Sequence, residues 1–215
     1  WIARRELSRN ASSRTLQRRL RPGEAAALST EEHVAVVQRV VKTVKGRVPV
    51  VAGVGSPATH KSVKLARQCA EVGADALLAV TPYYVRPNAV GLYQHFTTVA
   101  DATKLPVILY NVPGRTGVDL SAETMVRLAV EEPRVVGVKE ASGTARVQEL
   151  VRRLEARVGD RVAVLSGDDA SNLASYAVGG RGCISVTGNV APAEVVAVWK
   201  AAAAGDFSRA KTLHH

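Results

Sequence analysis

The chain has 215 residues, of which 47% are hydrophobic and only 4% aromatic, so one domain can bury a sizeable core made mostly of Val, Ala and Leu. The formal net charge is +10, but residues 1–22 carry seven arginines against one acid, which leaves +4 for the other 193 residues. This distribution excludes a strongly basic nucleic-acid-binding face on the globular part. The sequence also has no apolar run of 18 residues, so no segment is expected to span a membrane. We therefore expect neither nucleic acid nor a membrane among its partners.

Residues 1–22, WIARRELSRNASSRTLQRRLRP, differ in composition from everything that follows. They are rich in Arg and Ser, almost free of acids, and show no strand-like run. Such a segment is typical of an organelle transit peptide or a disordered basic arm, and a third interpretation is a stretch translated in an altered frame. We therefore treat residues 1–22 as an atypical segment, disordered or non-native, and residues 23–215 as the domain.

From residue 30 onward, short apolar runs alternate with helical patterns. The first helix is predicted at 31–46, with Thr30 as its N-cap and Gly46 as its end. Strands are predicted, in chain order, at 48–53, 76–80, 107–111, 135–139, 162–166 and 183–187. Further helices are predicted at 59–73, 89–103, 121–132, 146–159, 169–180 and 191–205.

This alternation indicates an α/β fold with a parallel sheet and right-handed crossovers. A TIM (β/α)8 barrel and an open doubly wound sheet both fit the period. The polar side chains that could carry chemistry all follow the carboxyl ends of strands, as in a TIM barrel. Only about six of the eight strands of such a barrel can be recognised, so we expect an incomplete barrel. The two cysteines, Cys69 and Cys183, lie far apart and are expected to be reduced thiols of a cytoplasmic protein.

Two neighbouring strands end on residues suited to carbonyl chemistry. The run VVGVK ends on Lys139, and VILYN carries Tyr110 near its end. A lysine in a mostly apolar site has a lowered pKa and can attack a carbonyl carbon to form a Schiff base, while a tyrosine can move the protons that this chemistry requires. Arg115 in the following loop could hold a substrate carboxylate. Together these residues predict an aldolase-type enzyme acting on a keto acid.

Five segments make the chain resemble the 4-hydroxy-tetrahydrodipicolinate synthase family, also called dihydrodipicolinate synthase. They occur in the family's order and spacing, and the likeness runs from about residue 23 to 215. The segments are TPYYVRPNAVGLYQHF (81–96), YNVPGRTG (110–117), VVGVKEASG (135–143), LSGDDA (165–170) and GGRGCISVTGNV (179–190).

The resemblance implies a lyase that condenses pyruvate with L-aspartate 4-semialdehyde to 4-hydroxy-tetrahydrodipicolinate, for lysine and diaminopimelate biosynthesis. It assigns the Schiff base to Lys139, acid–base catalysis to Tyr110, the second substrate's carboxylate to Arg115 and the border of the pyruvate site to Ile184. Tyr84 would enter a neighbouring subunit's site within a homotetramer, a dimer of dimers. The covalent imine replaces a cofactor, and we expect no metal. Glu140 is expected to be structural.

The sequence departs from the family pattern before residue 23. The family's two site threonines should stand at positions 21 and 22, where Arg21 and Pro22 supply no hydroxyl. The upstream segment also lacks two expected strands, which would leave two open sheet edges. Two alternatives therefore stay open: a catalytically impaired fragment of the family, and a sister aldolase of the N-acetylneuraminate lyase or keto-deoxy sugar acid aldolase type.

Overall fold

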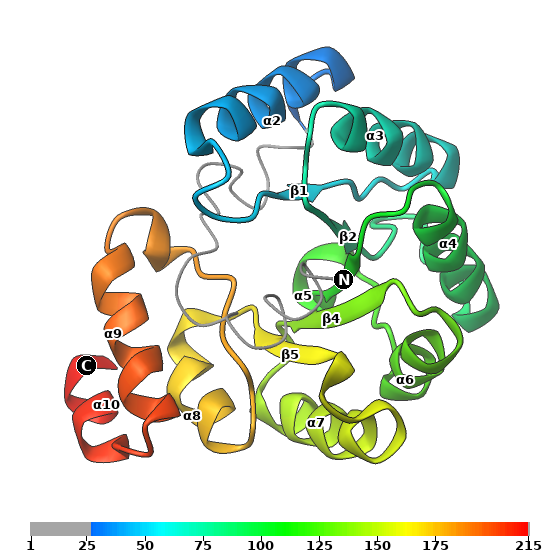
Figure 1. Cartoon of the computed structure of the whole chain (residues 1–215). Helices are drawn as coiled ribbons and strands as arrows, with labels where there is room; N and C mark the ends of the chain where they lie inside the picture. The colour runs from blue at the N-terminus through cyan, green and yellow to red at the C-terminus, as the bar shows by residue number, and fades with distance from the viewer. Residues whose placement is uncertain (1–26, 215) are drawn as a thin grey trace.

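The computed structural model describes residues 27–214. Segment 1–22, with Arg21 and Pro22, lies outside the described residues, so the expectations about it stay predictions. The described part contains one five-stranded parallel sheet with helices on its outer side (Figure 1). The strands are β1 (Val51–Gly53), β2 (Ala76–Val80), β3 (Val107–Asn111), β4 (Val135–Glu140) and β5 (Ala163–Ser166).

The described helices are α2 (Thr30–Val44), α3 (Thr59–Glu71), α4 (Ala89–Asp101), α5 (Pro113–Thr116), α6 (Ala122–Glu131), α7 (Thr144–Val158), α8 (Asn172–Ala177), α9 (Pro192–Ala203) and α10 (Phe207–His214). Most of them follow one another around the outside of the sheet in chain order, whereas the short α5 lies inside this ring, and α9 and α10 lie side by side next to α8 (Figure 1). The helices α5 and α10 were not predicted, because each is too short to show a clear apolar period. Three 3-10 turns accompany the helices: η2 (Gly159–Arg161), η3 (Asp169–Ser171) and η4 (Thr187–Asn189).

The order of the strands decides between the two predicted architectures. A doubly wound sheet reverses its strand order at a switch point, whereas the strands of a (β/α)8 barrel follow one another around the ring. Here the order is β1-β2-β3-β4-β5, and every pair is parallel. The sheet is therefore an arc of a barrel, which confirms the predicted α/β class.

The prediction of a sixth strand at 183–187 is wrong. The chain meets β5 there through one parallel bridge, Ser166 with Cys183, and the Ile184 N–H donates to the Ser166 carbonyl at 2.9 Å. Beyond this point the carboxylate of Asp169 accepts the N–H groups of residues 186 and 187 at 2.9 and 2.8 Å. These bonds turn the chain into η4 (Thr187–Asn189), so the segment has the position of a sixth strand without its length.

The N-cap of α2 (Thr30–Val44) is Ser29 rather than the predicted Thr30. Ser29 and Glu32 form a reciprocal capping box, in which the Glu32 N–H donates to Ser29 Oγ at 3.2 Å and the Ser29 N–H to Glu32 Oε2 at 2.9 Å. The helix ends at Val44, two residues before Gly46, because Lys45 already takes the left-handed conformation with φ of 51°.

Successive strand residues point to opposite sides of the sheet, and the side that faces the helices carries the main core. Leu109 of β3 and Val138 of β4 pack there with helix residues such as Leu128 and Leu150, and all four are fully buried. Small and β-branched side chains fill most of this layer, as the composition predicted. The opposite side of the sheet lines the interior of the arc, where side chains near the strand ends are free to serve a site.

A β-bulge in β4 changes which residues of that strand face the interior. Val135 pairs with Val107, but Gly137 pairs with Ile108, so Val136 is an extra residue in the ladder. Because side chains alternate with a period of two, one extra residue exchanges the faces of all residues that follow. The first residue of β4 thus joins the helix-facing core, while the carboxyl end of the strand presents its alternate residues to the interior.

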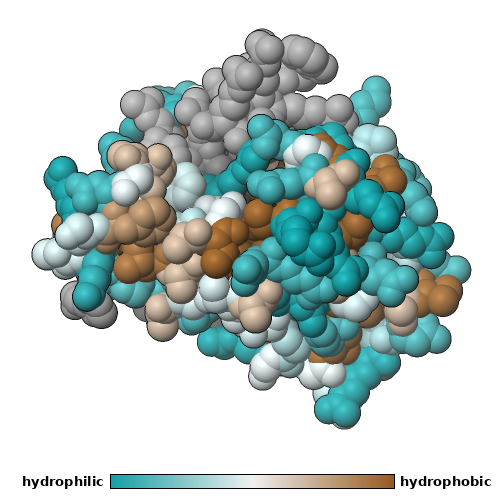
Figure 2. Space-filling model, turned by 90° about the horizontal axis from the view of Figure 1, so that it is seen from below, coloured by the Kyte–Doolittle hydropathy of each residue, from teal (hydrophilic) through white to brown (hydrophobic). Residues whose placement is uncertain are grey.

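The surface seen from below the view of Figure 1 is a mixture of hydrophilic residues and separate hydrophobic areas (Figure 2). Within residues 27–214, no helix is long and apolar enough to cross a membrane. Both predicted free thiols are found: Cys69 is buried, Cys183 is half-buried, and neither forms a disulfide.

Replacing Ser29 with Ala should lower the free energy of unfolding by about 1 kcal/mol, because the Glu32 N–H in the first turn of α2 loses its side-chain acceptor. Thr30→Ala is the matched control. It changes the first helical residue without touching the cap, and a shift of a few tenths of a kcal/mol at most is expected. Urea unfolding of both variants measures the difference. A larger loss for Thr30→Ala than for Ser29→Ala would contradict the capping assignment.

Candidate active site

Lys139 and Tyr110 meet on the interior side of the sheet, as the sequence predicted. They are direct partners in the parallel pairing of β3 with β4. The Lys139 Nζ lies 3.9 Å from the centroid of the Tyr110 ring, and the two side chains are 2% and 8% exposed. The bulge in β4 makes this meeting possible. If the pairing continued regularly from Val135 opposite Val107, Lys139 would stand opposite Asn111 and face the helices. A buried amine therefore lies against the face of a buried phenol.

The space that Lys139 occupies is created by a glycine in the loop after β5 (Ala163–Ser166). A Cβ atom on Gly167 would lie 3.0 Å from the Lys139 Cε and 2.9 Å from the Cβ of Ala141. Both distances are shorter than ordinary van der Waals contact. The lysine stem thus passes over Gly167 on its way to the interior.

Burial lowers the pKa of the Lys139 amine from its ordinary value of 10.5 to about 8. The charges of Asp169 and Cys183 act in the opposite direction, and the cation of Arg115 adds to the lowering. Near neutral pH, the neutral, nucleophilic form of the amine is therefore far more populated than in an exposed lysine.

Burial also raises the pKa of the Tyr110 phenol; the cation of Arg115 opposes this rise and the charge of Glu140 adds to it. The phenol thus stays protonated and able to donate a hydrogen bond near neutral pH. Arg115 acts on both reactive groups, although its own side chain is exposed. Its position follows from the short helix α5 (Pro113–Thr116), which has Pro113 at its start and ends on Gly117 with φ of +69°.

Tyr84 and Ile184 are more exposed than the buried pair. The Tyr84 side chain is 90% exposed and its φ is +72°, an uncommon conformation for a residue other than glycine. Its N–H donates to the carbonyl of Thr116 at 3.1 Å, which ties this loop to the end of α5. Ile184 is half-buried beside the end of β5, where its N–H donates to the Ser166 carbonyl. The structure thus shows direct contact between two of the five predicted site residues, Lys139 and Tyr110, and an electrostatic effect of Arg115 on both.

Asp169 was not among the site residues that the sequence predicted. Burial alone would raise its pKa, but hydrogen bonds from Ser185, Thr187 and Val186 leave the pKa of its carboxyl below the ordinary value. The resulting carboxylate acts on the charge of Lys139. The only sequence signal for this role was its place in LSGDDA, directly after a strand.

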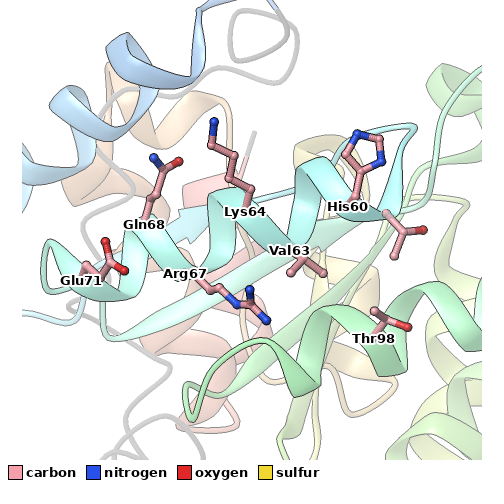
Figure 3. Close-up of a pocket in the computed structure, with 8 residues that line it drawn as sticks. His60, Val63, Lys64, Arg67, Gln68, Glu71 and Thr98 are labelled. Carbon is pink, nitrogen blue, oxygen red and sulfur yellow. The ribbon is translucent and has the colours of Figure 1, made fainter.

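An open groove lies away from these residues, on the outer side of the molecule between α3 (Thr59–Glu71) and α4 (Ala89–Asp101). Its volume is about 1000 Å³, and its side chains come mostly from α3 (Figure 3). Lys64 and Arg67 contribute two cations to its lining and Glu71 one anion, and Thr98 is the contribution of α4. Lys139 and Tyr110 do not line it, and nothing in the groove matches the carbonyl chemistry of the strand ends. In the part of the chain that the structure describes, no group of three or more His, Cys, Asp or Glu side chains could hold a metal ion.

The lowered pKa of Lys139 predicts a pH-dependent stability. Between about pH 8 and pH 10.5 the folded chain holds a neutral amine, while the unfolded chain still binds the proton, so the free energy of unfolding contributed by this residue rises with pH. Relative to Lys139→Met, the wild-type chain should gain on the order of 3 kcal/mol across this window.

Urea unfolding at several pH values tests this expectation. Lys104→Met, which removes an exposed lysine, is the control and should follow the wild-type curve. A difference between wild type and Lys139→Met that stays constant from pH 7 to pH 10.5 would mean that the amine is not held in a desolvated site.

Comparisons with known proteins identify the family of the chain. The family model described as the dihydrodipicolinate synthetase family matches residues 21–215. The 4-hydroxy-tetrahydrodipicolinate synthase of Thermodesulfovibrio yellowstonii is 47% identical over 194 residues, which are 90% of this chain and 65% of that protein. The chain thus spans just under two thirds of the length of this relative.

Two crystal structures show the same fold. Dihydrodipicolinate synthase from Aquifex aeolicus is 45% identical with a TM-score of 0.85, covering 89% of this chain and 64% of its own. The chloride-inhibited enzyme from Acinetobacter baumannii, complexed with pyruvate, is 42% identical with a TM-score of 0.87, covering 100% of this chain and 73% of its own. The arc of parallel strands is thus part of a TIM barrel, and the chain belongs to the dihydrodipicolinate synthetase family.

Proposed function

We propose that this chain carries the Schiff-base site of a 4-hydroxy-tetrahydrodipicolinate synthase, a cytoplasmic lyase that condenses pyruvate with L-aspartate 4-semialdehyde in lysine and diaminopimelate biosynthesis. The observation that carries the proposal is the buried Lys139 amine, with its pKa lowered to about 8, against the Tyr110 ring. Family membership supports the same reaction, and the Acinetobacter baumannii relative was crystallised with pyruvate.

The reaction begins on the neutral amine of Lys139. Its lone pair attacks the keto carbon of pyruvate, and loss of water from the resulting carbinolamine leaves an imine between Nζ and that carbon. Loss of a proton from the pyruvate methyl group then gives an enamine. The enamine carbon attacks the aldehyde carbon of the second substrate, which forms the new carbon–carbon bond. Finally, the amino group of the second substrate replaces Lys139 on the imine carbon, which closes the ring and releases the lysine.

Tyr110 moves protons during these steps. Formation of the imine needs a proton on the departing water, and the carbon–carbon bond step needs one on the aldehyde oxygen. A phenol with a raised pKa, in contact with the amine, is placed to donate the first and to recover a proton afterwards. No cofactor enters this scheme, because the imine itself withdraws electrons from the reacting carbon.

The exposed residues of the site serve the second substrate and the assembly. Arg115 has an exposed guanidinium beside the buried pair, so it can receive the carboxylate of the semialdehyde in a bidentate pair. Ile184 borders the pyruvate through its backbone at the end of β5. Tyr84 extends into solvent from a strained loop and can complete the site of a second copy, within a dimer of dimers.

Incubation with pyruvate followed by borohydride reduction should attach one pyruvyl group to Lys139, as located by peptide mass spectrometry. Lys139→Met should abolish the adduct, because the thioether has no nucleophilic nitrogen, whereas the surface variant Lys104→Met should trap pyruvate like the wild type. An adduct on another lysine, or none on a folded chain, would refute the proposal. An adduct without turnover of the semialdehyde would identify a catalytically impaired fragment.

Arg115→Ala tests the identity of the second substrate. Turnover of L-aspartate 4-semialdehyde should fall by about 10²-fold, since a charged hydrogen-bonded pair is lost. Pyruvate trapping should change by no more than about threefold, because Arg115 acts on Lys139 only through its charge. Comparable turnover of N-acetylneuraminate or of a keto-deoxy sugar acid, insensitive to this substitution, would favour a sister aldolase instead.

A further inference from the structure

A buried polar bridge lies behind the reactive pair, on the helix-facing side of the sheet. The Asn111 Nδ2 group donates to Glu140 Oε2 at 3.1 Å and to Asp119 Oδ1 at 2.8 Å, and Asn111 Oδ1 accepts the N–H of Leu120 at 3.0 Å. Glu140 Oε1 accepts the N–H of Ser142 at 2.7 Å. Asn111 is 0% exposed and Glu140 1% exposed, so each buried polar group has its partner inside the protein.

We propose that Asn111 and Glu140 are positioning residues, and that the bridge between their side chains fixes the register in which Lys139 and Tyr110 meet on the interior side. The inference deepens the proposed function and rests on it. Asn111 and Glu140 are direct partners in the sheet, one residue beyond the reactive pair on each strand. Since successive side chains point to opposite sides, one pair faces the interior and the next faces the helices.

Because of the bulge in β4 (Val135–Glu140), the pairing of β3 with β4 can take more than one register. The strand contains one extra residue near its start, so the pairing of its carboxyl end is not fixed by the pairing of its first residue. The bridge forms only when Asn111 stands opposite Glu140. A slip of one residue would place an amide or a carboxylate against the interior and would turn the amine toward the helices. The bridge thus selects the register that the chemistry needs.

Backbone hydrogen bonds connect the bridge to the loop that lies beside Lys139. The N–H of Ala141 donates to the Asn111 carbonyl at 3.0 Å, and the N–H of Gly167 donates to the Glu140 carbonyl at 2.7 Å. Gly167 is the residue over which the Lys139 stem passes. Movement at the end of β4 therefore alters the loop that leaves room for the amine.

The far end of the bridge is anchored on α7 (Thr144–Val158). Arg146 forms an ion pair with Asp119 at 2.9 Å, and its Nη1 donates to the Leu120 carbonyl at 3.1 Å. Glu149 of the same helix lies 3.6 Å from Arg146. The bridge thereby connects the two catalytic strands to the helix that follows β4. The carboxylate of Glu140 also contributes to the raised pKa of Tyr110, after burial, so bridge and phenol share one electrostatic environment.

Pyruvate trapping in variants of the bridge tests the inference. Asn111→Ala and Glu140→Ala should each slow adduct formation on Lys139 by on the order of tenfold or more, because small misplacements of reacting groups carry large rate costs. The double variant should be no slower than the slower single variant, since both remove the same bridge. Glu140→Gln keeps one oxygen, which can still accept the Ser142 N–H and the longer bond from Asn111 that Oε1 accepts at 3.3 Å, so it should slow adduct formation less than Glu140→Ala.

Glu132→Ala is the matched control for destabilisation. Glu132 is another buried acid, 6% exposed and paired with Arg134, but it precedes the opposite end of β4. Its loss should lower the midpoint of urea unfolding, as the bridge variants do, while trapping by the folded protein stays within about twofold of wild type. Equal slowing by Glu132→Ala and Asn111→Ala would overturn the inference, because the effect would then be general loss of stability.

Amide hydrogen exchange gives a second readout that needs no substrate. In Asn111→Ala the N–H groups of Ala141 and Gly167 should exchange faster, and in Glu132→Ala they should keep their wild-type rates. Unchanged exchange in Asn111→Ala would overturn the inference. If the wild-type chain forms no pyruvate adduct, the proposed function fails, and the exchange rates alone then decide whether the bridge holds the strand ends.

Discussion

The site depends on the removal of water from one amine. Lys139 has a charged group at its end, yet the structure leaves 2% of it exposed and places it over the ring of a tyrosine. Burying an ammonium without a close counter-charge is unfavourable, and the amine responds by releasing its proton more readily. The aromatic face offers a weak attraction to whatever cationic fraction remains. The same desolvation that costs stability therefore produces the nucleophile.

The charged groups around this amine differ in sign and in how far they are buried. The exposed cation of Arg115 favours the neutral amine and attracts anions, while the charge of Asp169 limits how far the pKa of Lys139 falls. An amine with a much lower pKa would be a poorer nucleophile, and one with an ordinary pKa would be protonated. In the proposed reaction the neutral amine attacks the keto carbon of pyruvate, and the cation at the rim suits the carboxylate of the second substrate. These features follow from loops placed after three consecutive strands, as expected at the carboxyl ends of barrel strands.

Much of this arrangement could be predicted from the sequence, because the strands are short apolar runs with clear ends. The predicted strand at 107–111 matches β3, and the one at 135–139 is one residue short of β4, so the meeting of Tyr110 and Lys139 followed from counting along two neighbouring strands. The sixth predicted strand failed, since CISVT has the composition of a strand but a distant carboxylate, Asp169, binds its backbone. The sequence also assigned Glu140 a structural role, but it did not single out Asn111 as the partner, although the register that pairs Tyr110 with Lys139 pairs these two residues next.

The bulge in β4 has a consequence for how this strand can change over time. Its first residue, Val135, packs in the layer shared with the helices, and beyond Val136 the two sides alternate, with Val138 in that layer and Lys139 on the interior. Substitutions at positions 135 and 138 are judged by how well they fill the outer layer, and those at position 139 by what they do to the reacting carbon. Packing and chemistry thus fall on alternate residues of one strand, so the scaffold can be retuned for temperature without altering the reagent that it carries.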